Sequence, residues 1–520
     1  MNLDHDRAAS RPLGVASKLL DRAVDAAAIS LKEVVLTGER DILSSENGRW
    51  CFLDALTLLS RVVGKLTVVM PLGMDALRAE VEMYSSRLWS QTPIQVTSVG
   101  NPITLESSDA VLSVGAQVKP SLNWTVINSN GWVARVSSGV TSLPCDVDQP
   151  NPLGALMAAS FGVTEVFKRI FSVPHEVAPL FEKTEFSLFD QTTTSASVGP
   201  PLPDSLNIPD TLLVGAGAIG NGIALLLSRL NLRGRVHLVD KQDYADENLG
   251  TCILLERAGW IGVGKAVRLA NWLGENSNLE VTAEKSVIAS ALDGPLLSRL
   301  TVDLVLNGLD DAEARRDAQG LWPAIIVDGG INEIGTAVVQ HRLDQERRAC
   351  LKCWFESPQV DERLQQSRLT GLNIASLNDL GRTLTDDDIA HAAEDKRDWL
   401  LERKTEGKTL CSVISEAALS TKLGVEVEEG FRPSVPFVAT AAASMVMAEA
   451  VKALAFPEVP VAGMFQIASL FLGPGETAMK LDRLPSVSCP CVVHRATILR
   501  LHASRQRMHP QPSPLQDEPV

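Results

Sequence analysis

A glycine-rich turn constrains this chain more than any other feature of its sequence. An apolar run that begins at Leu212 predicts a strand, and residues 218–230 beyond the turn have the apolar period of a helix. The turn has the spacing Gly-x-Gly-x-x-Gly and contains Gly215, Gly217 and Gly220. A second apolar run, 236–239, ends at Asp240. Glycines let the backbone approach phosphate, a helix N-terminus presents N–H groups to it, and an acid at this place accepts from a ribose hydroxyl. The segment therefore predicts a nucleotide site in an α/β fold.

The composition is that of a globular protein and argues against several classes of partner. The 520 residues are 45% hydrophobic and 21% charged, and a formal net charge of −15 disfavours nucleic acid and anionic membranes. The polar N-terminus, 1–11, has no secretory pattern, so we expect a cytoplasmic chain. The stretch 437–456 has the length of a membrane span, but Glu449 and Lys452 within it favour a buried helix.

Two parts of the chain, separated by a Pro-rich break at 199–204, share a pattern that predicts an internal duplication. In each part, Ala-Ala-Ser on a helical run is followed by glutamate and then lysine at the same offsets: residues 158–160, Glu165 and Lys168, and residues 442–444, Glu449 and Lys452. A strand that ends in a loop precedes each helix, at 110–115 and at 303–308. The alternative is that the first part is an unrelated α/β domain.

The first part lacks the nucleotide chemistry of the second. Its best candidate for a first strand, 66–73, has no Gly-x-Gly-x-x-Gly, and Pro71 stands where the phosphate turn would be. We therefore expect the first part to be a degenerate copy that has lost its nucleotide site.

The second part alternates strand and helix, which predicts a doubly wound, mainly parallel sheet. The expected strands are 211–215, 236–240, a strand around 280, 303–307 and 324–328. A charged, largely helical section then interrupts the α/β pattern. The expected boundaries are 1–200 for the degenerate copy, 208–355 for the first part of the active domain, 356–432 for a helical insertion, 433–495 for the return of the active domain and 496–520 for a disordered tail.

Charged residues beyond Asp240 argue for a triphosphate rather than a redox dinucleotide. Lys265 opens a predicted helix, and Asp310 follows the strand 303–307, with Arg315 five positions later. An ammonium group and a carboxylate at the carboxyl edge of such a sheet suit a triphosphate and its magnesium ion. The alternative is that these are ordinary solvated side chains.

In this region the chain resembles the adenylation domains of ubiquitin-activating enzymes and of the ThiF- and MoeB-type activators of sulfur-carrier proteins. The run of Gly-x-Gly-x-x-Gly, acid, Asn-Leu, Lys, Asp and Cys-x-x-Cys occurs in order over residues 208–495. The resemblance implies ATP and Mg²⁺ as cofactors. It assigns the phosphate turn to the three glycines, the ribose to Asp240, phosphates to Asn248 and Lys265, and Mg²⁺ to Asp310.

One departure from the family pattern is a missing arginine. The family continues Asn-Leu-x-Arg-Gln, whereas this chain has Thr251 and Cys252 after Asn248-Leu249-Gly250. In two-part activators the inactive half commonly lends such an arginine, and here the candidates are Arg7, Arg11 and Arg40.

Two pairs of cysteines predict a structural zinc site. The ligands would be Cys350, Cys353, Cys489 and Cys491. Four thiolates satisfy the tetrahedral preference of Zn²⁺ and leave no open position. Because the second pair is Cys-x-Cys and not Cys-x-x-Cys, the fourth ligand is either Cys491 or His494. A redox Cys-x-x-Cys is the less favoured interpretation, since the context is not thioredoxin-like.

Cys411 is the predicted nucleophile. It lies in the charged insertion, before a helical pattern that runs to Leu423, and a helix N-terminus lowers the pKa of a cysteine. In relatives that form a thioester, the nucleophile follows the Cys-x-x-Cys and precedes Thr or Ser, as Cys411 precedes Ser412. The alternative is a buried structural cysteine.

The resemblance implies a two-step reaction. The C-terminal carboxylate of a ubiquitin-like protein is adenylated, then transferred to Cys411 and passed to a ubiquitin-conjugating-like enzyme. The predicted order of domains, an inactive half followed by an active half with a short cysteine insertion, resembles that of compact bacterial activators from conjugation operons. Antiphage defence is the expected context. Three alternatives stay open: a sulfur-carrier adenylyltransferase without a thioester step, an NAD-dependent oxidoreductase, and a nucleotide-binding scaffold without turnover.

Overall fold

The structure is a computed structural model. It describes residues 3–20, 24–90, 92–98, 107–119, 123–193, 196–256, 259–292, 301–309, 311–332, 334–356, 362–378, 382–410, 412–414, 416–417, 435–460 and 462–508. Contacts divide the chain into two compact units. Unit 1 comprises Met1–Phe355 and Ser434–Val520, and unit 2 comprises Glu356–Pro433.

The first half of unit 1 contains a seven-stranded sheet in the order β3-β2-β1-β4-β5-β6-β7. Strands β3 to β5 in this order are parallel, and β6 and β7 are antiparallel additions. The elements of this half are α1 (Leu3–Leu20), α2 (Ala26–Ser30), β1 (Glu33–Gly38), α3 (Arg40–Leu43), α4 (Glu46–Ser60), β2 (Lys65–Met70), α5 (Asp75–Arg87), β3 (Gln95–Ser98), β4 (Ala110–Val114), β5 (Trp124–Asn130), β6 (Val133–Ser137), α7 (Pro152–Ile170) and β7 (Thr184–Ser187).

The second half contains an eight-stranded sheet in the order β12-β11-β9-β13-β14-β15-β16-β17, again parallel as far as β14 and antiparallel beyond it. Its first elements are β8 (Leu206–Asn207), β9 (Thr211–Val214), α8 (Ala218–Arg229), β10 (Leu232–Arg233), β11 (Arg235–Val239), the 3-10 helix η1 (Asp246–Gly250), α9 (Lys265–Glu275) and β12 (Glu280–Glu284). The remaining ones are α10 (Ile288–Leu292), β13 (Leu304–Asn307), α11 (Ala312–Gln319), β14 (Ile325–Ile331), β15 (Thr336–Arg342), α12 (Leu351–Trp354), α17 (Pro436–Ala455), β16 (Met464–Ile467), α18 (Pro474–Thr477), β17 (Ala478–Leu481), α19 (Pro490–Val493) and α20 (Arg495–Met508).

The two sheets have the same topology, which confirms the doubly wound fold and its degenerate copy. Numbered from the first strand of each sheet, the orders read 3-2-1-4-5-6-7 and 3-2-1-4-5-6-7-8, so β1 corresponds to β9 and β4 to β13. One detail of the sequence prediction is wrong. The segment 66–73 contains the second strand of the first half, β2, because β1 (Glu33–Gly38) takes the central position.

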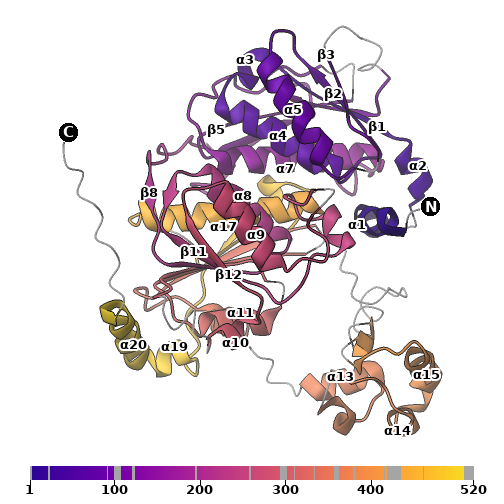
Figure 1. Cartoon of the computed structure of the whole chain (residues 1–520), viewed down its shortest axis with the longest axis vertical. Helices are drawn as coiled ribbons and strands as arrows, with labels where there is room; N and C mark the ends of the chain where they lie inside the picture. Colours follow the sequence, from indigo (N-terminus) through magenta and orange to yellow (C-terminus); the bar gives the residue numbers. More distant parts are fainter. Residues whose placement is uncertain are drawn as a thin grey trace. The chain divides into compact units, whose positions relative to one another are not determined.

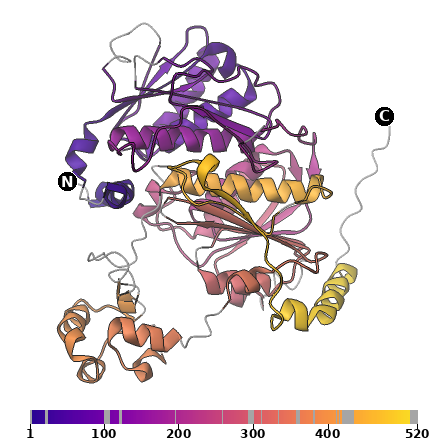
Figure 2. The ribbon, with the colours of Figure 1, turned by 180° about the vertical axis from the view of Figure 1, so that it is seen from behind.

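Helices from both halves lie between the two sheets (Figures 1 and 2). Helix α7 from the first half packs on α17 and α8 from the second, and Asp54 of α4 accepts from Arg229 of α8 at 2.6 and 2.7 Å. Pro152 and Pro436 each occupy the first turn of a long helix, where a missing N–H costs nothing. Where α7 meets α17, the hydroxyls of Ser160 and Thr440 lie 2.8 Å apart. One buried apolar cluster extends through both halves, so they form a single core.

The shared Glu-Lys pattern forms matching buried ion pairs in the two long helices. Glu165 and Lys168 lie 2.6 Å apart in α7, and Glu449 and Lys452 lie 2.5 Å apart in α17. Each lysine also donates to main-chain carbonyls, which provides the further partners that a buried charge needs. Within the described chain, α17 is the one helix long and apolar enough to cross a membrane, and 94% of its most apolar window is buried. This burial confirms the expected core helix.

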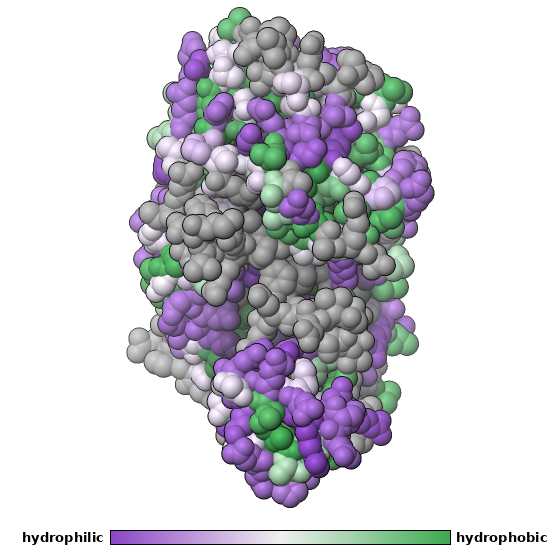
Figure 3. Space-filling view, turned by 90° about the vertical axis from the view of Figure 1, so that its right-hand side faces the viewer, coloured by the Kyte–Doolittle hydropathy of each residue, from purple (hydrophilic) through white to green (hydrophobic). Residues whose placement is uncertain are grey.

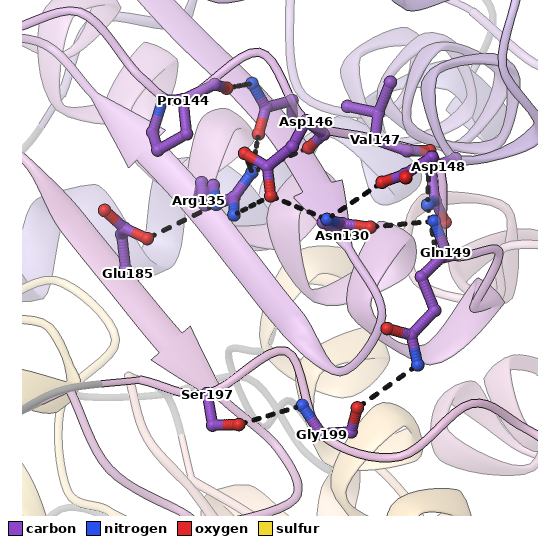
Figure 4. Close-up of polar contacts among 12 residues, drawn as sticks. Asn130, Arg135, Pro144, Asp146, Val147, Asp148, Gln149, Glu185, Ser197 and Gly199 are labelled. Atoms are coloured by element: carbon purple, nitrogen blue, oxygen red, sulfur yellow. Dashed lines mark hydrogen bonds and ion pairs between the residues drawn. The ribbon is translucent and has the colours of Figure 1, made fainter.

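The connections between the sixth strand and the long helix differ sharply between the halves. In the second half this connection contains the cysteine pair at 350–353 and all of unit 2. In the first half it is the short segment 138–151, held by a polar network (Figure 4). Arg135 donates to both carboxylate oxygens of Asp146 at 3.0 and 3.1 Å, Asn130 donates to Asp146 at 2.7 Å, and Asn130 accepts from the Gln149 N–H at 2.9 Å. This network makes the segment a fixed return to α7.

Unit 2 is helical in the part that the structure describes. Its elements are α13 (Glu362–Thr370), η3 (Ile374–Asn378), α14 (Asp386–Ala390), η4 (Glu394–Lys396) and α15 (Arg397–Thr405). A small apolar cluster that includes Leu400, Leu410 and Val413 forms its core. Glu416 accepts from Arg403 at 2.8 Å and from Lys408 at 2.9 Å, and these two cations lower the pKa of Glu416 despite its burial. The unit therefore has a core and an ion network of its own.

The C-terminal segment contains a helix where we expected disorder. Residues 495–508 form α20, which corrects this part of the predicted tail 496–520. Ile498 is buried, Arg505 donates to the Leu321 carbonyl at 2.6 Å, and Gln506 donates to Asp303 at 2.7 Å. Residues 509–520 lie outside the described chain. Elsewhere on the surface, hydrophilic and hydrophobic residues are interspersed on the face in Figure 3.

Candidate nucleotide site and cysteine cluster

Glycine is present at each of the three positions of the turn after β9 for a different structural reason. Gly215 has φ +88°, a conformation that side chains with a Cβ rarely adopt. A Cβ on Gly220 would lie 2.0 Å from the Gly215 carbonyl oxygen, so any larger residue would break the turn. Gly217 caps α8 and has no atom within 4 Å of where a Cβ would be. The turn is therefore tightly closed on one side and open at the helix N-terminus, where an anion can approach.

Asp240 fixes this turn from the end of the neighbouring strand β11. One carboxylate oxygen accepts from the Ala216 N–H at 2.8 Å, and the other accepts from the Gln242 N–H at 2.8 Å. A carboxylate has about four lone-pair sites, so these two bonds leave acceptors for a ribose. The ribose role of Asp240 stays a prediction.

Lys265 is the first residue of α9, and its side chain is nearly buried. The residue is 7% exposed, and its Nζ donates to the neutral Gln242 side chain at 2.8 Å. Among the residues that the structure describes, no carboxylate forms an ion pair with Lys265. A desolvated ammonium without an anion attracts a phosphate strongly. Asn248, 8% exposed, uses its side-chain oxygen to accept from the Ala245 N–H at 2.9 Å and so shapes η1.

Two residues that the sequence did not reveal brace the turn from behind. Asn221 is fully buried, and its amide donates to the carbonyls of Ala216 and Gly217 at 3.0 and 2.8 Å. The Tyr244 hydroxyl donates to the Ala216 carbonyl at 2.9 Å. Both side chains are buried polar groups next to the glycine motif, and no spacing rule marks them in the sequence.

The Arg315 side chain binds groups of the protein itself. Its guanidinium donates to the Leu309 carbonyl at 2.9 and 2.6 Å and lies 3.4 Å from the Asp328 carboxylate. Arg315 therefore positions the segment that leads into Asp310. Asp310 itself lies outside the described residues, so its magnesium role stays a prediction, as does the nucleotide role of Arg315.

Asp328 predicts a pH effect on stability. Burial raises its pKa from 3.8 to about 7, against the opposing influence of Arg315 and a hydrogen bond from Asn307. Because the pKa is higher in the folded state, protonation of Asp328 contributes to the free energy of unfolding. This contribution, at most about 4 kcal/mol, is complete below about pH 4 and is lost as pH rises through about 7. Asp328→Asn removes the titration, so its melting temperature should change less between these pH values than that of the wild type. Thermal melts measure this, with Asp344→Asn, an exposed acid, as the control. Equal slopes for wild type and Asp328→Asn would contradict the assignment.

The first half contributes arginines to the wall of this site. Helix α1 packs on η1, and Arg11 lies 3.7 Å from Glu247, the neighbour of Asn248. Arg61, at the end of α4, is fully buried and donates to the carbonyls of Ile253 and Leu255 at 3.0 and 2.7 Å. Burial lowers the pKa of Arg61 to about 10. Of the three arginines proposed from the sequence, Arg11 thus lies near the segment in which Thr251 replaces the family arginine. Arg40 is exposed beside Gly73, and the Arg7 side chain lies outside the described residues.

A carboxylate occupies the backbone donors at the equivalent strand end of the first half. The first residue after the first strand is Gly215 in one half and Glu39 in the other. Glu39 accepts from the backbone N–H groups of Ala116 and Gln117 at 3.0 and 2.7 Å, in the loop after β4. A phosphate at this place would meet a negative charge that already occupies the N–H donors. The lost nucleotide site therefore has a structural cause.

This occupation of the donors predicts one nucleotide per chain. Isothermal titration with ATP and Mg²⁺ should give a stoichiometry of one, because in the described residues the second half has the open glycine turn and the ammonium of Lys265, whereas Glu39 occupies the equivalent N–H donors of the first half. Glu39→Gln should leave that number unchanged, since an amide oxygen can still accept from these donors. A stoichiometry of two would contradict the occupation of the donors.

The four cysteines of the two pairs come together. The sulfur atoms of Cys350 and Cys353 lie 3.8 Å apart, and each lies 3.6 Å from one sulfur of the second pair, Cys489 or Cys491. A tetrahedral Zn²⁺ with Zn–S bonds of about 2.3 Å separates its sulfurs by about 3.8 Å. The cluster is buried, and all four sulfurs lie within 4.8 Å of one another, so it could hold a metal ion such as zinc. Cys491, not His494, belongs to this group.

Cys411 lies outside the described residues, and its role as nucleophile stays a prediction. Of the described residues around this position, Leu410 and Val413 are buried in the core of unit 2. Thr409 accepts from the Ser412 N–H at 3.4 Å and from Val413 N–H through its carbonyl at 3.0 Å. These bonds are those of a chain that is starting a helix.

Comparison with known proteins identifies the family. The model of the ThiF family matches residues 190–491, more than half of the chain. The chain therefore belongs to the ThiF family, and the resemblance to ThiF- and MoeB-type proteins is confirmed.

More distant comparisons are less informative. Uncharacterized protein y4jF of Sinorhizobium fredii (strain NBRC 101917 / NGR234) is 33% identical over 259 residues, 48% of this chain and 47% of that protein. The chain thus spans about half the length of the curated relative it matches. Crystal structures of E. coli MccB also match: with MccA-N7isoASN at 14% identity over 55% of this chain and 67% of that one, and alone at 12% identity over 55% and 65%, each with a TM-score of 0.35.

Proposed function

We propose that this protein is an ATP-dependent adenylyltransferase that activates the C-terminal carboxylate of a small ubiquitin-like protein. The observation that carries the proposal is Lys265, a nearly buried ammonium whose described partner is the neutral Gln242, next to an open glycine turn. Such a cation can stabilise the charge that develops on the phosphates of a triphosphate, whereas the hydride-transfer step of a nicotinamide enzyme does not require it. Membership in the ThiF family supports the same reaction class.

The chemistry asks the protein mainly for positioning. A carboxylate oxygen of the substrate attacks the α-phosphorus of ATP, the bond to the β-phosphate oxygen breaks, and pyrophosphate leaves with the electron pair. Gly217 and the N-terminus of α8 face the phosphates, Lys265 neutralises their charge, and Asp240 holds the ribose. Arg11 from the first half compensates for the family arginine replaced by Thr251. Magnesium, held by Asp310, would neutralise further phosphate charge.

The second proposed step is thioester formation. The Cys411 thiolate attacks the acyl carbon of the adenylate, AMP leaves, and the thioester then passes to the cysteine of a ubiquitin-conjugating-like enzyme. Cys411 belongs to unit 2, and its ThiF-family context and the residue Ser412 after it support this role. A sulfur-carrier adenylyltransferase without this step is the second candidate, favoured if Cys411 proves dispensable.

ATP–pyrophosphate exchange tests the first step. With Mg²⁺ and a small ubiquitin-like protein that ends in glycine, we expect exchange that depends on both the protein and its free C-terminal carboxylate. The matched control is the same small protein with an amidated C-terminus. Binding of NAD without binding of ATP would overturn the proposal and favour an oxidoreductase.

Mass spectrometry of the intact protein tests the second step. We expect an adduct of the ubiquitin-like protein that dithiothreitol removes and that Cys411→Ala abolishes, while exchange persists. Cys145→Ala, at an exposed cysteine of the first half, should retain the adduct. Exchange in the wild type without any reducible adduct would leave adenylation as the whole activity.

A further inference from the structure

Tyr244 contacts both elements that the proposed function assigns to phosphate. Its hydroxyl donates to the Ala216 carbonyl in the glycine turn at 2.9 Å, and its ring centroid lies 5.9 Å from the Lys265 ammonium. The backbone of Tyr244 binds the segment just before α9, because Tyr244 N–H donates to the Val263 carbonyl at 2.9 Å and Gly262 N–H donates to the Tyr244 carbonyl at 2.8 Å. One residue thus joins the turn after β9 to the start of α9.

The Tyr244 hydroxyl braces the glycine turn together with Asn221, whose backbone N–H also donates to the Gly217 carbonyl at 2.9 Å. The Asn221 amide has two N–H donors but faces three acceptors within 3.0 Å, namely the carbonyls of Ala216 and Gly217 and the Tyr244 oxygen. The Tyr244 hydroxyl accepts from Asn221 and donates to Ala216, so each acceptor has a donor. Without the hydroxyl, the Ala216 carbonyl loses one of its donors and an Asn221 N–H loses its acceptor. A buried polar group that loses its partner costs about 1–3 kcal/mol, and a less firmly held carbonyl can rotate toward a phosphate, which it would repel.

The side chain of Tyr244 is held in one position. The residue is 1% exposed, and its ring meets Trp260 edge-to-face at 5.4 Å. Burial raises the pKa of Tyr244 well above its usual value, so the hydroxyl stays a proton donor throughout the neutral range. The hydrogen bond to Ala216 is therefore a fixed part of the site.

We infer that Tyr244 is a positioning residue that holds the glycine turn and Lys265 in register for the phosphates of a nucleoside triphosphate. This inference rests on the proposed function. The hydroxyl keeps the Ala216 carbonyl turned away from the ligand, and the ring sets the place of the ammonium. The two contributions can be separated, because phenylalanine keeps the ring and loses the hydroxyl.

The test is calorimetric titration of the full chain with ATP and Mg²⁺, and separately with adenosine. Tyr244→Phe should weaken ATP binding by roughly tenfold, the expected result of losing one hydrogen bond to the turn, and should change adenosine binding by less than about twofold. Tyr244→Leu, which also loses the ring beside Lys265, should weaken ATP binding further. The matched control is Tyr84→Phe, because Tyr84 is the other of the two tyrosines and its hydroxyl meets Thr57 at 3.2 Å in the first half.

The outcomes separate the possible failures. If wild type binds ATP and Tyr244→Phe binds it equally well, the inference is wrong while the proposed function stands. An equal loss for ATP and adenosine would show a general structural role and would also overturn the inference. A wild-type chain that binds no ATP refutes the proposed function itself.

Discussion

Lys265→Ala should lower the rate of ATP–pyrophosphate exchange by roughly 10²–10³-fold, the usual result of removing one preorganised charge from a phosphate or oxyanion site. The ammonium is nearly buried, its described hydrogen bond is to a neutral amide, and no carboxylate among the described residues compensates its charge. Because charge on the phosphates increases as pyrophosphate departs, the loss should appear in kcat as well as in the KM for ATP.

Two further variants define this expectation. Lys265→Arg keeps the charge but not the compact ammonium, and should recover part of the rate. Lys183→Ala removes a lysine that pairs with Glu185 in the first half and should leave exchange unchanged. If Lys265→Ala lost only thermal stability and kept its exchange rate per folded molecule, the assignment of Lys265 to the phosphates would be wrong.

Cys353→Ser should remove bound zinc and lower the melting temperature by roughly 10 °C or more, since a structural metal contributes directly to folding. The four thiols join α12, which precedes unit 2 in the sequence, to α19, which follows it. Ile498 of α20 packs in the same cluster. Without the metal, the C-terminal segment loses one of its attachments to the second half, while the hydrogen bonds of Arg505 and Gln506 remain. Cys145→Ser, at an exposed cysteine, is the matched control and should keep both metal and stability.

Elemental analysis and chelation provide the independent check. Protein purified without chelator should contain about one zinc per chain, and a strong chelator should lower the melting temperature of the wild type toward that of Cys353→Ser. Wild-type protein without zinc, or a chelator without effect on it, would show that the four thiols are held by packing alone.

Local sequence signals revealed those parts of the fold whose chemistry lies in adjacent residues. The strand β9, the turn and α8 follow directly from the glycines, because each glycine answers a constraint within the same ten residues. The cysteine pairs were also evident, since thiols at such spacing have few other uses. The glycine pattern lies within one short segment, and each cysteine pair lies within a short segment of its own.

Features that depend on distant contacts were missed or misplaced. The strand β1 was overlooked because Glu39, where a glycine would mark the turn, gives no nucleotide signal and functions only through N–H groups after β4. Helix α20 has a polar sequence and is stabilised by contacts with Leu321 and Asp303. The ion pair of Arg315 with Asp328 was also missed, because nothing local in the sequence indicates that approach, while the nucleotide role of Arg315 stays a prediction.

The shared core between the two sheets has a consequence for how this protein can be made. Since α7 and α17 each bury their apolar faces on the other half, neither half presents a finished surface when expressed by itself. A gene divided at the Pro-rich junction should yield two insoluble fragments if each is produced separately. The same fragments should become soluble on co-expression, by complementation into a heterodimer.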